Sequence, residues 1–252
     1  MAKSELLYGL HCVEAALSSR PETVLELMIQ LEREDERIIR LLAQARDLGV
    51  SVQRVKCRKL DQMLDPSSSQ RVNHQGVIAV CRIQVAANEG DLDKHLDSVL
   101  HPPLLLLLDS VSDPQNLGAC LRVADGVGVD AVITTKDRAV GMTPVVRRVA
   151  SGAAESVPFF QVTNLTRTMK SLQDRGIFIV GTDLGDEAKS LYSVDLQGPL
   201  ALVMGAEGKG LRRLVRESAD QLVFLPMKGS VQSLNVATAA GVCLYEALRQ
   251  RS

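Results

Sequence analysis

The sequence predicts an α/β protein in which a small α/β domain precedes a C-terminal domain built on a parallel sheet. The chain has 252 residues, more than the usual single domain, so two domains are expected. Apolar residues make up 46% of the chain and charged residues 23%, a composition that can bury a sizeable core. From residue 104 onward, short apolar runs alternate with helical stretches, which is typical of parallel strands covered on both faces.

Residues 1–83 are predicted to form the small domain. Its elements are expected in this order: a strand at 24–31, a helix at 32–49 that Gly49 ends, a strand at 50–55, a short helix at 59–64 and a strand at 76–83. Residues 84–103 are polar and end in Pro102 and Pro103, so we interpret them as the linker.

Residues 104–252 form the second predicted domain. The strand candidates are the apolar runs LLLLLD, DAVITT, ESVPFFQV, GIFIVGT, LALVMG and QLVFLPM. In a parallel sheet, ligands bind beyond the carboxyl ends of the strands. The loops after Leu108, Val180, Met204 and Leu225 are therefore the expected functional loops.

Composition excludes several classes of protein. The net charge is −1 and aromatic residues make up 3%, without tryptophan, which argues against a uniformly basic surface and a broad base-stacking platform but allows a local basic patch. The five cysteines lie far apart without a CxxC pair, and the four histidines lack metal-ligand spacing, so no metal is expected. Without a visible secretion signal or an apolar run of about 20 residues, we expect a soluble, cytoplasmic protein that does not enter membranes.

The loop after Leu108 opens a predicted helix. Asp113 and Pro114 turn the chain, Asn116 can cap the helix, and Gly118 permits close approach of a backbone. Arg122 is expected within about one turn of the opening end. The same residues are also consistent with a capped helix that has an arginine on its surface and no function in binding.

The loop after Met204 surrounds Glu207 with Gly205, Gly208 and Gly210. A dinucleotide-binding fingerprint fails because Arg213 stands where the third glycine belongs, and no Walker A motif is present. The glycines indicate either backbone that is open to a ligand beside one carboxylate, or a tight turn before a helix.

Basic residues suggest phosphate contacts in three places. One is a helical stripe beside this loop, formed by Lys209, Arg212, Arg213 and Arg216; the others are the Arg147–Arg148 pair and residues 53–59 (QRVKCRK). Solvated surface charge is the alternative interpretation of each.

The last loop leads into a helix rich in small residues. Ser233 and Asn235 stand at its entrance, where such residues commonly cap a helix. The small residues that follow allow close packing of another backbone, either internal or from a second subunit; they are Ala237, Ala239, Ala240 and Gly241.

Three segments in this order, NLGACLR (116–122), MGAEGKG (204–210) and LPMKGSVQSLNVATA (225–239), resemble the signature motifs of the SpoU/TrmH (SPOUT) family of RNA ribose 2′-O-methyltransferases. YGLHCVEAAL (8–17) and HQGVIA (74–79) are similar to the N-terminal RNA substrate-binding domain of family members that act on 23S rRNA, and VASGAAESVP (149–158) also matches. The resemblance covers nearly the whole chain.

The resemblance implies an S-adenosylmethionine-dependent enzyme with a trefoil knot, normally a homodimer. Its substrate is expected to be a guanosine ribose in the peptidyl-transferase region of 23S rRNA. The implied cofactor-binding residues are Thr182, Gly205, Leu225, Met227 and Leu234, and the implied catalytic residues are Asn116, Arg122, Glu207, Ser233 and Asn235.

A ribose hydroxyl is a poor nucleophile until its proton leaves or its developing charge is stabilised. Because a guanidinium stays protonated, our hypothesis is that Arg122 holds a phosphate and stabilises the alkoxide, while Asn116, Ser233 and Asn235 fix the geometry and Glu207 orients Arg122 or a loop amide. The alternatives are a tRNA ribose methyltransferase, a non-catalytic RNA-binding protein of ribosome assembly and, disfavoured by the missing glycine, a nicotinamide-dependent oxidoreductase.

Overall fold

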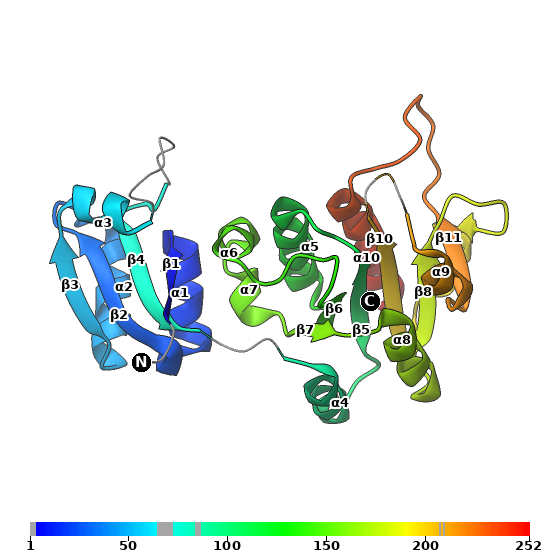
Figure 1. The fold of residues 1–252 in the computed structure, drawn as a ribbon, viewed down its shortest axis with the longest axis horizontal. Coiled ribbons are helices and arrows are strands. Elements are labelled where there is room, and N and C mark those ends of the chain that lie inside the picture. Colours follow the sequence, from blue (N-terminus) through cyan, green and yellow to red (C-terminus); the bar gives the residue numbers. More distant parts are fainter. Residues whose placement is uncertain (1–3, 65–72, 84–86, 207, 209) are drawn as a thin grey trace. The chain divides into compact units, whose positions relative to one another are not determined.

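The computed structural model describes residues 4–64, 73–83, 87–206, 208 and 210–252. The chain forms two compact units, each described by itself below (Figure 1). The first contains Met1–Val85 and Pro144–Ser156, and the second contains Ala86–Thr143 and Val157–Ser252.

The first unit is a four-stranded mixed sheet with helices on both faces. In sheet order the strands are β1 (Ser4–Tyr8), β4 (Val77–Arg82), β2 (Val24–Gln30) and β3 (Ser51–Val55), and only β2 and β3 run parallel. The helices are α1 (Leu10–Ser19), α2 (Glu36–Asp47), α3 (Cys57–Leu64), α6 (Pro144–Ala150), α7 (Ala153–Ser156) and the 3-10 turn η1 (Pro21–Thr23). Strand β2 alternates its side chains between the two faces: Leu27 and Ile29 pack with α1 and α2, whereas Met28 packs with Leu60 of α3.

Most predicted elements of this unit are present with shifted ends. Helix α2 begins at Glu36 rather than residue 32, because the side chain of Asp35 accepts the N–H of Ile38 and caps the helix there. Strand β1 and helix α1 were not among the predicted elements. Both contribute buried residues to the core, Leu7 and Val13 among them.

The segment expected to be a linker contains helix α4 (Glu89–Ser98). Asn88 and Asp91 form a reciprocal capping box at its start. The side chain of Asp91 accepts the backbone N–H of Asn88, and the side chain of Asn88 accepts the backbone N–H of Gly90. Leu92 and Leu96 are buried in the core of the second unit. The polar composition of this segment therefore belongs to the exposed face of a packed helix.

The second unit is built on a seven-stranded sheet in which every neighbouring pair is parallel. In sheet order the strands are β7 (Phe159–Val162), β6 (Ala131–Thr135), β5 (Leu104–Asp109), β10 (Leu200–Gly205), β8 (Phe178–Thr182), β11 (Gln221–Phe224) and β9 (Lys189–Ser190). Its helices are α4, α5 (Pro114–Val127), α8 (Leu165–Asp174), α9 (Arg213–Glu217), α10 (Val236–Arg251) and the 3-10 turn η2 (Leu191–Ser193). The predicted α/β class with a parallel sheet is confirmed.

Strand β10 lies at the centre of this sheet, between β5 and β8, although it follows both along the chain. All six residues of β5 are buried, as a strand covered on both faces requires. The trefoil knot that the resemblance implies stays a prediction. Among the described residues, no helix has the length and apolar character needed to cross a bilayer.

Candidate functional site

Three loops at the carboxyl edge of the parallel sheet surround one cavity of about 500 Å³. They follow β8, β10 and β11, which are neighbours in the sheet and therefore end at the same edge. The five residues predicted to bind the cofactor all line this cavity, and Ser233 joins them; they are Thr182, Gly205, Leu225, Met227 and Leu234. The fold thus brings together residues from three loops that are far apart in sequence, two of which belong to the motifs at 204–210 and 225–239.

Gly205 is the position where this loop tolerates no side chain. A Cβ atom at Gly205 would lie 2.2 Å from the carbonyl carbon of Gly210 and 2.4 Å from its oxygen. The two segments are joined there by an antiparallel bridge between Ala206 and Gly210, and Gly210 has a left-handed φ of 64°. The loop after β10 therefore folds back tightly on itself and presents backbone to the cavity.

The cavity also has residues that the sequence analysis did not single out. Asp183, Leu184, Phe224 and Gln232 contribute to its lining. Asp183 follows β8 directly, and its carboxylate lies 3.5 Å from a guanidinium nitrogen of Arg216. Its position at the carboxyl end of a parallel strand is the signal that could have identified it.

A second cavity, of about 670 Å³, adjoins the first. Both are lined by Ala206, Gly210 and Val236, so they share one wall. Asn116 lines the second cavity, and its Oδ1 accepts a hydrogen bond of 2.8 Å from Nδ2 of Asn235. This bond ties the first turn of α5 to the start of α10, two helices that begin at the same place.

The helix entrances differ partly from the predictions. Asn235 caps α10 as expected, because its Oδ1 accepts the N–H of Ala237 at 2.9 Å. Asn116 does not cap α5, since Asp113 holds that position and accepts the N–H of Gln115. The combination of aspartate followed by proline at the first helical position is a strong start signal, and it places Asn116 inside the first turn.

Arg122 lies farther from the helix opening than predicted. Because α5 begins at Pro114, Arg122 is roughly two turns into the helix, where its side chain is exposed. It lines neither cavity. Glu207 and Lys209 lie outside the described residues.

Two arginines of the expected basic stripe form ion pairs with different carboxylates. Arg213 pairs with Glu217 at 3.0 Å and Arg216 with Asp183. Helix α9 has only five residues, too short to align these side chains with Arg212, which precedes it. Arg147 is not available for phosphate either, because it is buried in the first unit and pairs with Glu5 and Glu155.

The small residues of α10 serve an internal contact. Gly241 faces Val123 of α5, whose methyl carbons would lie 3.7 and 3.8 Å from a Cβ atom there, and Ala240 is fully buried. Of the two possibilities left by the sequence, the packing of α10 against α5 accounts for this stripe.

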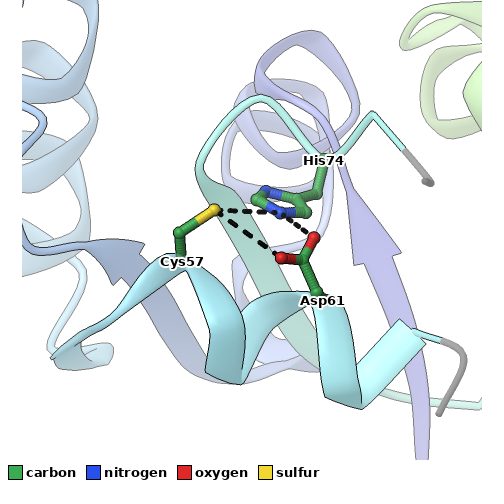
Figure 2. A group of neighbouring side chains, drawn as sticks. All are labelled: Cys57, Asp61 and His74. Carbon is green, nitrogen blue, oxygen red and sulfur yellow. Dashed lines mark hydrogen bonds and ion pairs between the residues drawn. The ribbon is translucent and has the colours of Figure 1, made fainter.

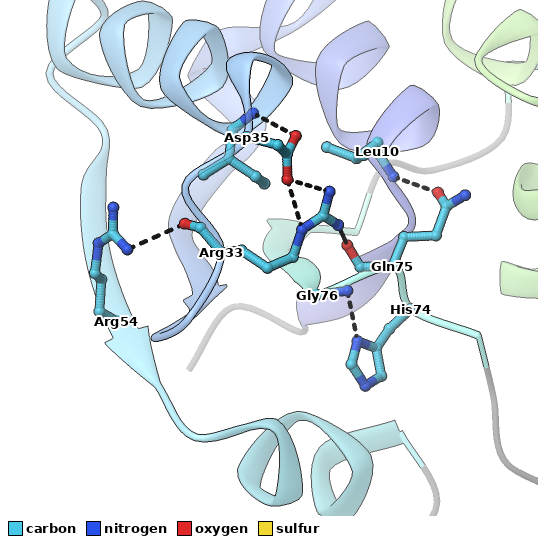
Figure 3. Close-up of polar contacts among 8 residues, drawn as sticks. Leu10, Arg33, Asp35, Arg54, His74, Gln75 and Gly76 are labelled. Atoms are coloured by element: carbon cyan, nitrogen blue, oxygen red, sulfur yellow. Dashed lines mark hydrogen bonds and ion pairs between the residues drawn. The ribbon is translucent and has the colours of Figure 1, made fainter.

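In the first unit, a hydrogen-bond network fixes the loop before β4 (Figure 3). The side chain of Gln75 accepts the N–H of Leu10 at 2.9 Å, and its backbone carbonyl accepts a hydrogen bond from Arg33. Arg33 also bonds Asp35, which lowers the pKa of that carboxyl below its ordinary value. Arg54 donates to the carbonyl of Leu31 at 3.1 Å. In the basic segment 53–59, all four basic residues are exposed; they are Arg54, Lys56, Arg58 and Lys59.

Three possible metal ligands gather where α3 meets this loop (Figure 2). Sγ of Cys57 lies 3.8 Å from Oδ2 of Asp61 and 3.9 Å from Nε2 of His74, and that nitrogen lies 3.1 Å from Oδ1 of Asp61. Ligands of tetrahedral zinc are separated by about 3.3–3.6 Å, which follows from the usual bond lengths. Sequence spacing gave no sign of this cluster.

The hydrogen bonds of His74 favour a different role for this cluster. The N–H of Gly76 donates to Nδ1 of His74 at 2.9 Å, so the one proton of the neutral ring lies on Nε2 and is directed at Asp61. A metal at Nε2 needs that nitrogen deprotonated and the opposite N–H donated to an acceptor. We interpret the pair of Asp61 and His74 as a clamp that holds the loop at 73–76 against α3.

Two family models match the chain. Residues 103–245 match the SpoU rRNA Methylase family, and residues 6–84 match the model for RNA 2′-O ribose methyltransferase substrate binding. The two matches follow the division into units except at residues 144–156, which the methylase match covers and which belong to the first unit.

Similar proteins extend over the full chain. The 23S rRNA (guanosine-2′-O-)-methyltransferase RlmB of Shewanella oneidensis is 51% identical over 251 residues, which cover 100% of this chain and 99% of that protein. RlmB of Ralstonia nicotianae is 50% identical over 261 residues, covering 100% and 98%. Among solved structures, the SpoU methyltransferase AviRb from Streptomyces viridochromogenes, in complex with AdoMet, superposes with a TM-score of 0.79 at 27% identity, covering 98% of this chain and 90% of AviRb.

The parallel sheet, the loops that converge at its carboxyl edge and the separate substrate-binding unit define an RNA-modifying methyltransferase. The chain belongs to the SpoU rRNA methylase family.

Proposed function

We propose that this enzyme transfers a methyl group from S-adenosylmethionine to the 2′ oxygen of a guanosine ribose in 23S rRNA, in the peptidyl-transferase region, and that it works in the cytoplasm. The observation that carries the proposal is the convergence of the second and third motifs on one cavity, which adjoins a second cavity lined by Asn116 of the first motif. The names of the RlmB relatives supply the expected substrate. A tRNA substrate remains an outcome of the test below.

The residues around the first cavity fit the proposed cofactor. Its volume of about 500 Å³ lies in the usual range for small-molecule sites. The tight approach of Gly205 to Gly210 leaves backbone groups to contact the ligand, while Leu225, Met227 and Leu234 offer apolar surface. Bound there, the cofactor supplies a methyl group already activated by its sulfonium.

The chain's own contribution is to place the ribose hydroxyl and stabilise the charge that develops on its oxygen. The hydrogen bond between Asn116 and Asn235 joins the N-terminal ends of α5 and α10 at the border of the two cavities. Both helix dipoles put positive potential there, where it favours an oxyanion. Among the described residues that line the cavities, none is a histidine or a cysteine, so positioning and electrostatics dominate this proposal.

We further propose that the enzyme works as a homodimer and that Arg122 acts within it. Arg122 is exposed on α5, away from both cavities of its own chain. On the neighbouring α10, Tyr245 is 54% exposed, and its hydroxyl lies close to Gly126 of α5. A second copy docked on this α5–α10 surface covers the tyrosine and can bring Arg122 toward bound RNA. The roles of Ser233 and Glu207 stay predictions.

The function is tested by incubating the purified enzyme with labelled S-adenosylmethionine and transcripts of 23S rRNA and tRNA, and then mapping the methylated ribose by mass spectrometry. We expect one methylated guanosine in 23S rRNA. Methylation of tRNA alone would reassign the substrate, and binding of the cofactor without transfer to any RNA would contradict the enzymatic proposal. Light scattering of wild type and Tyr245→Glu tests the dimer: a monomeric wild type would refute it.

A further inference from the structure

The second cavity contains the guanidinium of Arg212, which the sequence analysis placed in a basic stripe together with Arg213 and Arg216. Arg212 lines this cavity, and its backbone N–H and its Nε both donate to the carboxylate of Asp109, at 2.8 and 2.6 Å. Asp109 is fully buried at the end of β5 and also accepts a hydrogen bond from the hydroxyl of Ser110 at 3.2 Å. The carboxylate therefore accepts three hydrogen bonds, two of them from Arg212.

This arrangement leaves the outer part of Arg212 for another partner. Asp109 accepts from Nε and not from the two terminal amino groups, and the side chain is 42% exposed. Within the described part of the chain, these two groups have no hydrogen-bond acceptor. A guanidinium fixed in this way is ready to bind two oxygen atoms of one anion without further loss of side-chain freedom.

A second arginine lines the same cavity from the loop after β6. Arg138 is exposed and adopts a left-handed φ of 61°, a conformation rare outside glycine. Its loop is tied to the cavity rim by a backbone hydrogen bond of 3.0 Å from Val140 to Val111. No carboxylate among the described residues pairs with Arg138. The structure therefore keeps this second positive charge at the rim.

Two carboxylates lie beside these guanidiniums: Asp109 pairs with Arg212, and Asp113 lines the same cavity. Asp113 accepts the backbone N–H that caps α5, and Asp109 is occupied as described above. The cavity thus holds one guanidinium fixed by Asp109 and a second one, of Arg138, without a carboxylate partner among the described residues, and it shares a wall with the proposed cofactor cavity.

We propose that Arg212, positioned by Asp109, and Arg138 bind phosphates of the RNA backbone next to the nucleotide that accepts the methyl group. This inference rests on the proposed function, because it takes the second cavity as the place of the acceptor nucleotide. Both arginines are positioning residues. The bound phosphates fix the register of the RNA, and thereby the distance between the ribose oxygen and the methyl donor.

The test measures how the affinity of the full-length enzyme for the 23S rRNA transcript depends on salt, with S-adenosylhomocysteine present. The logarithm of the binding constant falls as the logarithm of the salt concentration rises, and each lost phosphate contact makes this slope shallower by about 0.7 for single-stranded RNA. We expect this loss in Arg138→Gln and Arg212→Gln. Arg212→Lys keeps the charge but loses the two-pronged geometry, so its affinity should fall while its slope stays near that of wild type.

Arg213→Gln is the matched control. It removes one positive charge from the neighbouring position, but Arg213 lies outside both cavities and pairs with Glu217. Calorimetric titration with S-adenosylmethionine checks that each variant retains its cofactor site. Arg212→Gln leaves the buried Asp109 without its main partner and is expected to destabilise the fold, so Arg138→Gln and Arg212→Lys keep the proposal falsifiable.

Three results would overturn the inference: unchanged affinity and slope in Arg138→Gln and Arg212→Lys, an equal loss of slope in the control, or a defect that disappears when the acceptor guanosine is replaced by adenosine. The last result would show that Arg212 reads the base. If wild type methylates RNA but the variants behave like wild type, only this inference fails. If wild type neither binds nor methylates the transcript, the proposed function itself fails.

Discussion

The close approach of Gly205 to the backbone of Gly210, in the loop after β10, predicts that Gly205→Ala weakens the binding of S-adenosylmethionine. The added methyl carbon would lie 2.2 Å from the carbonyl carbon of Gly210, more than an ångström inside ordinary contact. Both atoms belong to backbone, and neither can rotate away as a side chain does. Overpacking of this kind costs about 1–3 kcal/mol. If about 2 kcal/mol falls on the loop conformation that binds the ligand, the dissociation constant for S-adenosylmethionine rises roughly 30-fold.

Isothermal titration calorimetry measures this affinity, and thermal unfolding shows whether the variant remains folded. Gly198→Ala is the control, because a Cβ atom at Gly198 meets nothing within 4 Å and the residue lines neither cavity. We expect wild-type affinity for the control. Affinity of Gly205→Ala within twofold of wild type would refute the view that this close approach shapes the cofactor site.

Three further predictions concern stability and the helix entrance. Asn235→Asp keeps an oxygen that caps α10 but cannot donate to Asn116, so we expect near-wild-type unfolding with slowed single-turnover methyl transfer. Asn235→Ala should slow transfer and also lose about 1 kcal/mol of stability. Equal transfer rates in wild type and Asn235→Asp would contradict this. Arg249 holds the pKa of Glu246 at about 2, below its ordinary value of 4.5, so this carboxylate stabilises the fold above pH 4.5 and loses that effect as the pH falls toward 2. Urea unfolding of Glu246→Gln should therefore show a weaker dependence on pH in this range, and an unchanged dependence would count against the ion pair. Leu106→Ala removes a fully buried side chain from β5 and should cost about 2–5 kcal/mol in chemical denaturation, while a loss below 1 kcal/mol would argue against a tightly packed core.

The parallel sheet was predictable because its strands are continuous apolar runs between helices. Helix α4 was not predicted, because its composition is polar and only Leu92 and Leu96 face the core. Strand β9 has two residues and joins the sheet by pairing with β11, so no local pattern indicates it. Pairing along the sheet, rather than local preference, forms such elements.

The first cavity was largely predictable, since its lining follows the carboxyl ends of parallel strands. The bond between Asn116 and Asn235 joins residues 119 positions apart, and Asp109 meets Arg212 across 103 positions. Neither pairing leaves a trace in local spacing. The prediction for Arg122 was displaced because the start of α5 was assigned too late, at Asn116 rather than after Asp113.

The central place of β10 has a consequence for synthesis on the ribosome. Leu104 of β5 pairs with Leu200 of β10, so β5 must wait for most of the enzyme domain to be translated before that neighbour exists. Until then, β5, β6 and β7 can form only a partial sheet whose open edge is an apolar strand. Such an edge is a template for unwanted pairing between nascent chains. Slow, late completion of the sheet makes aggregation during translation the characteristic hazard of this architecture.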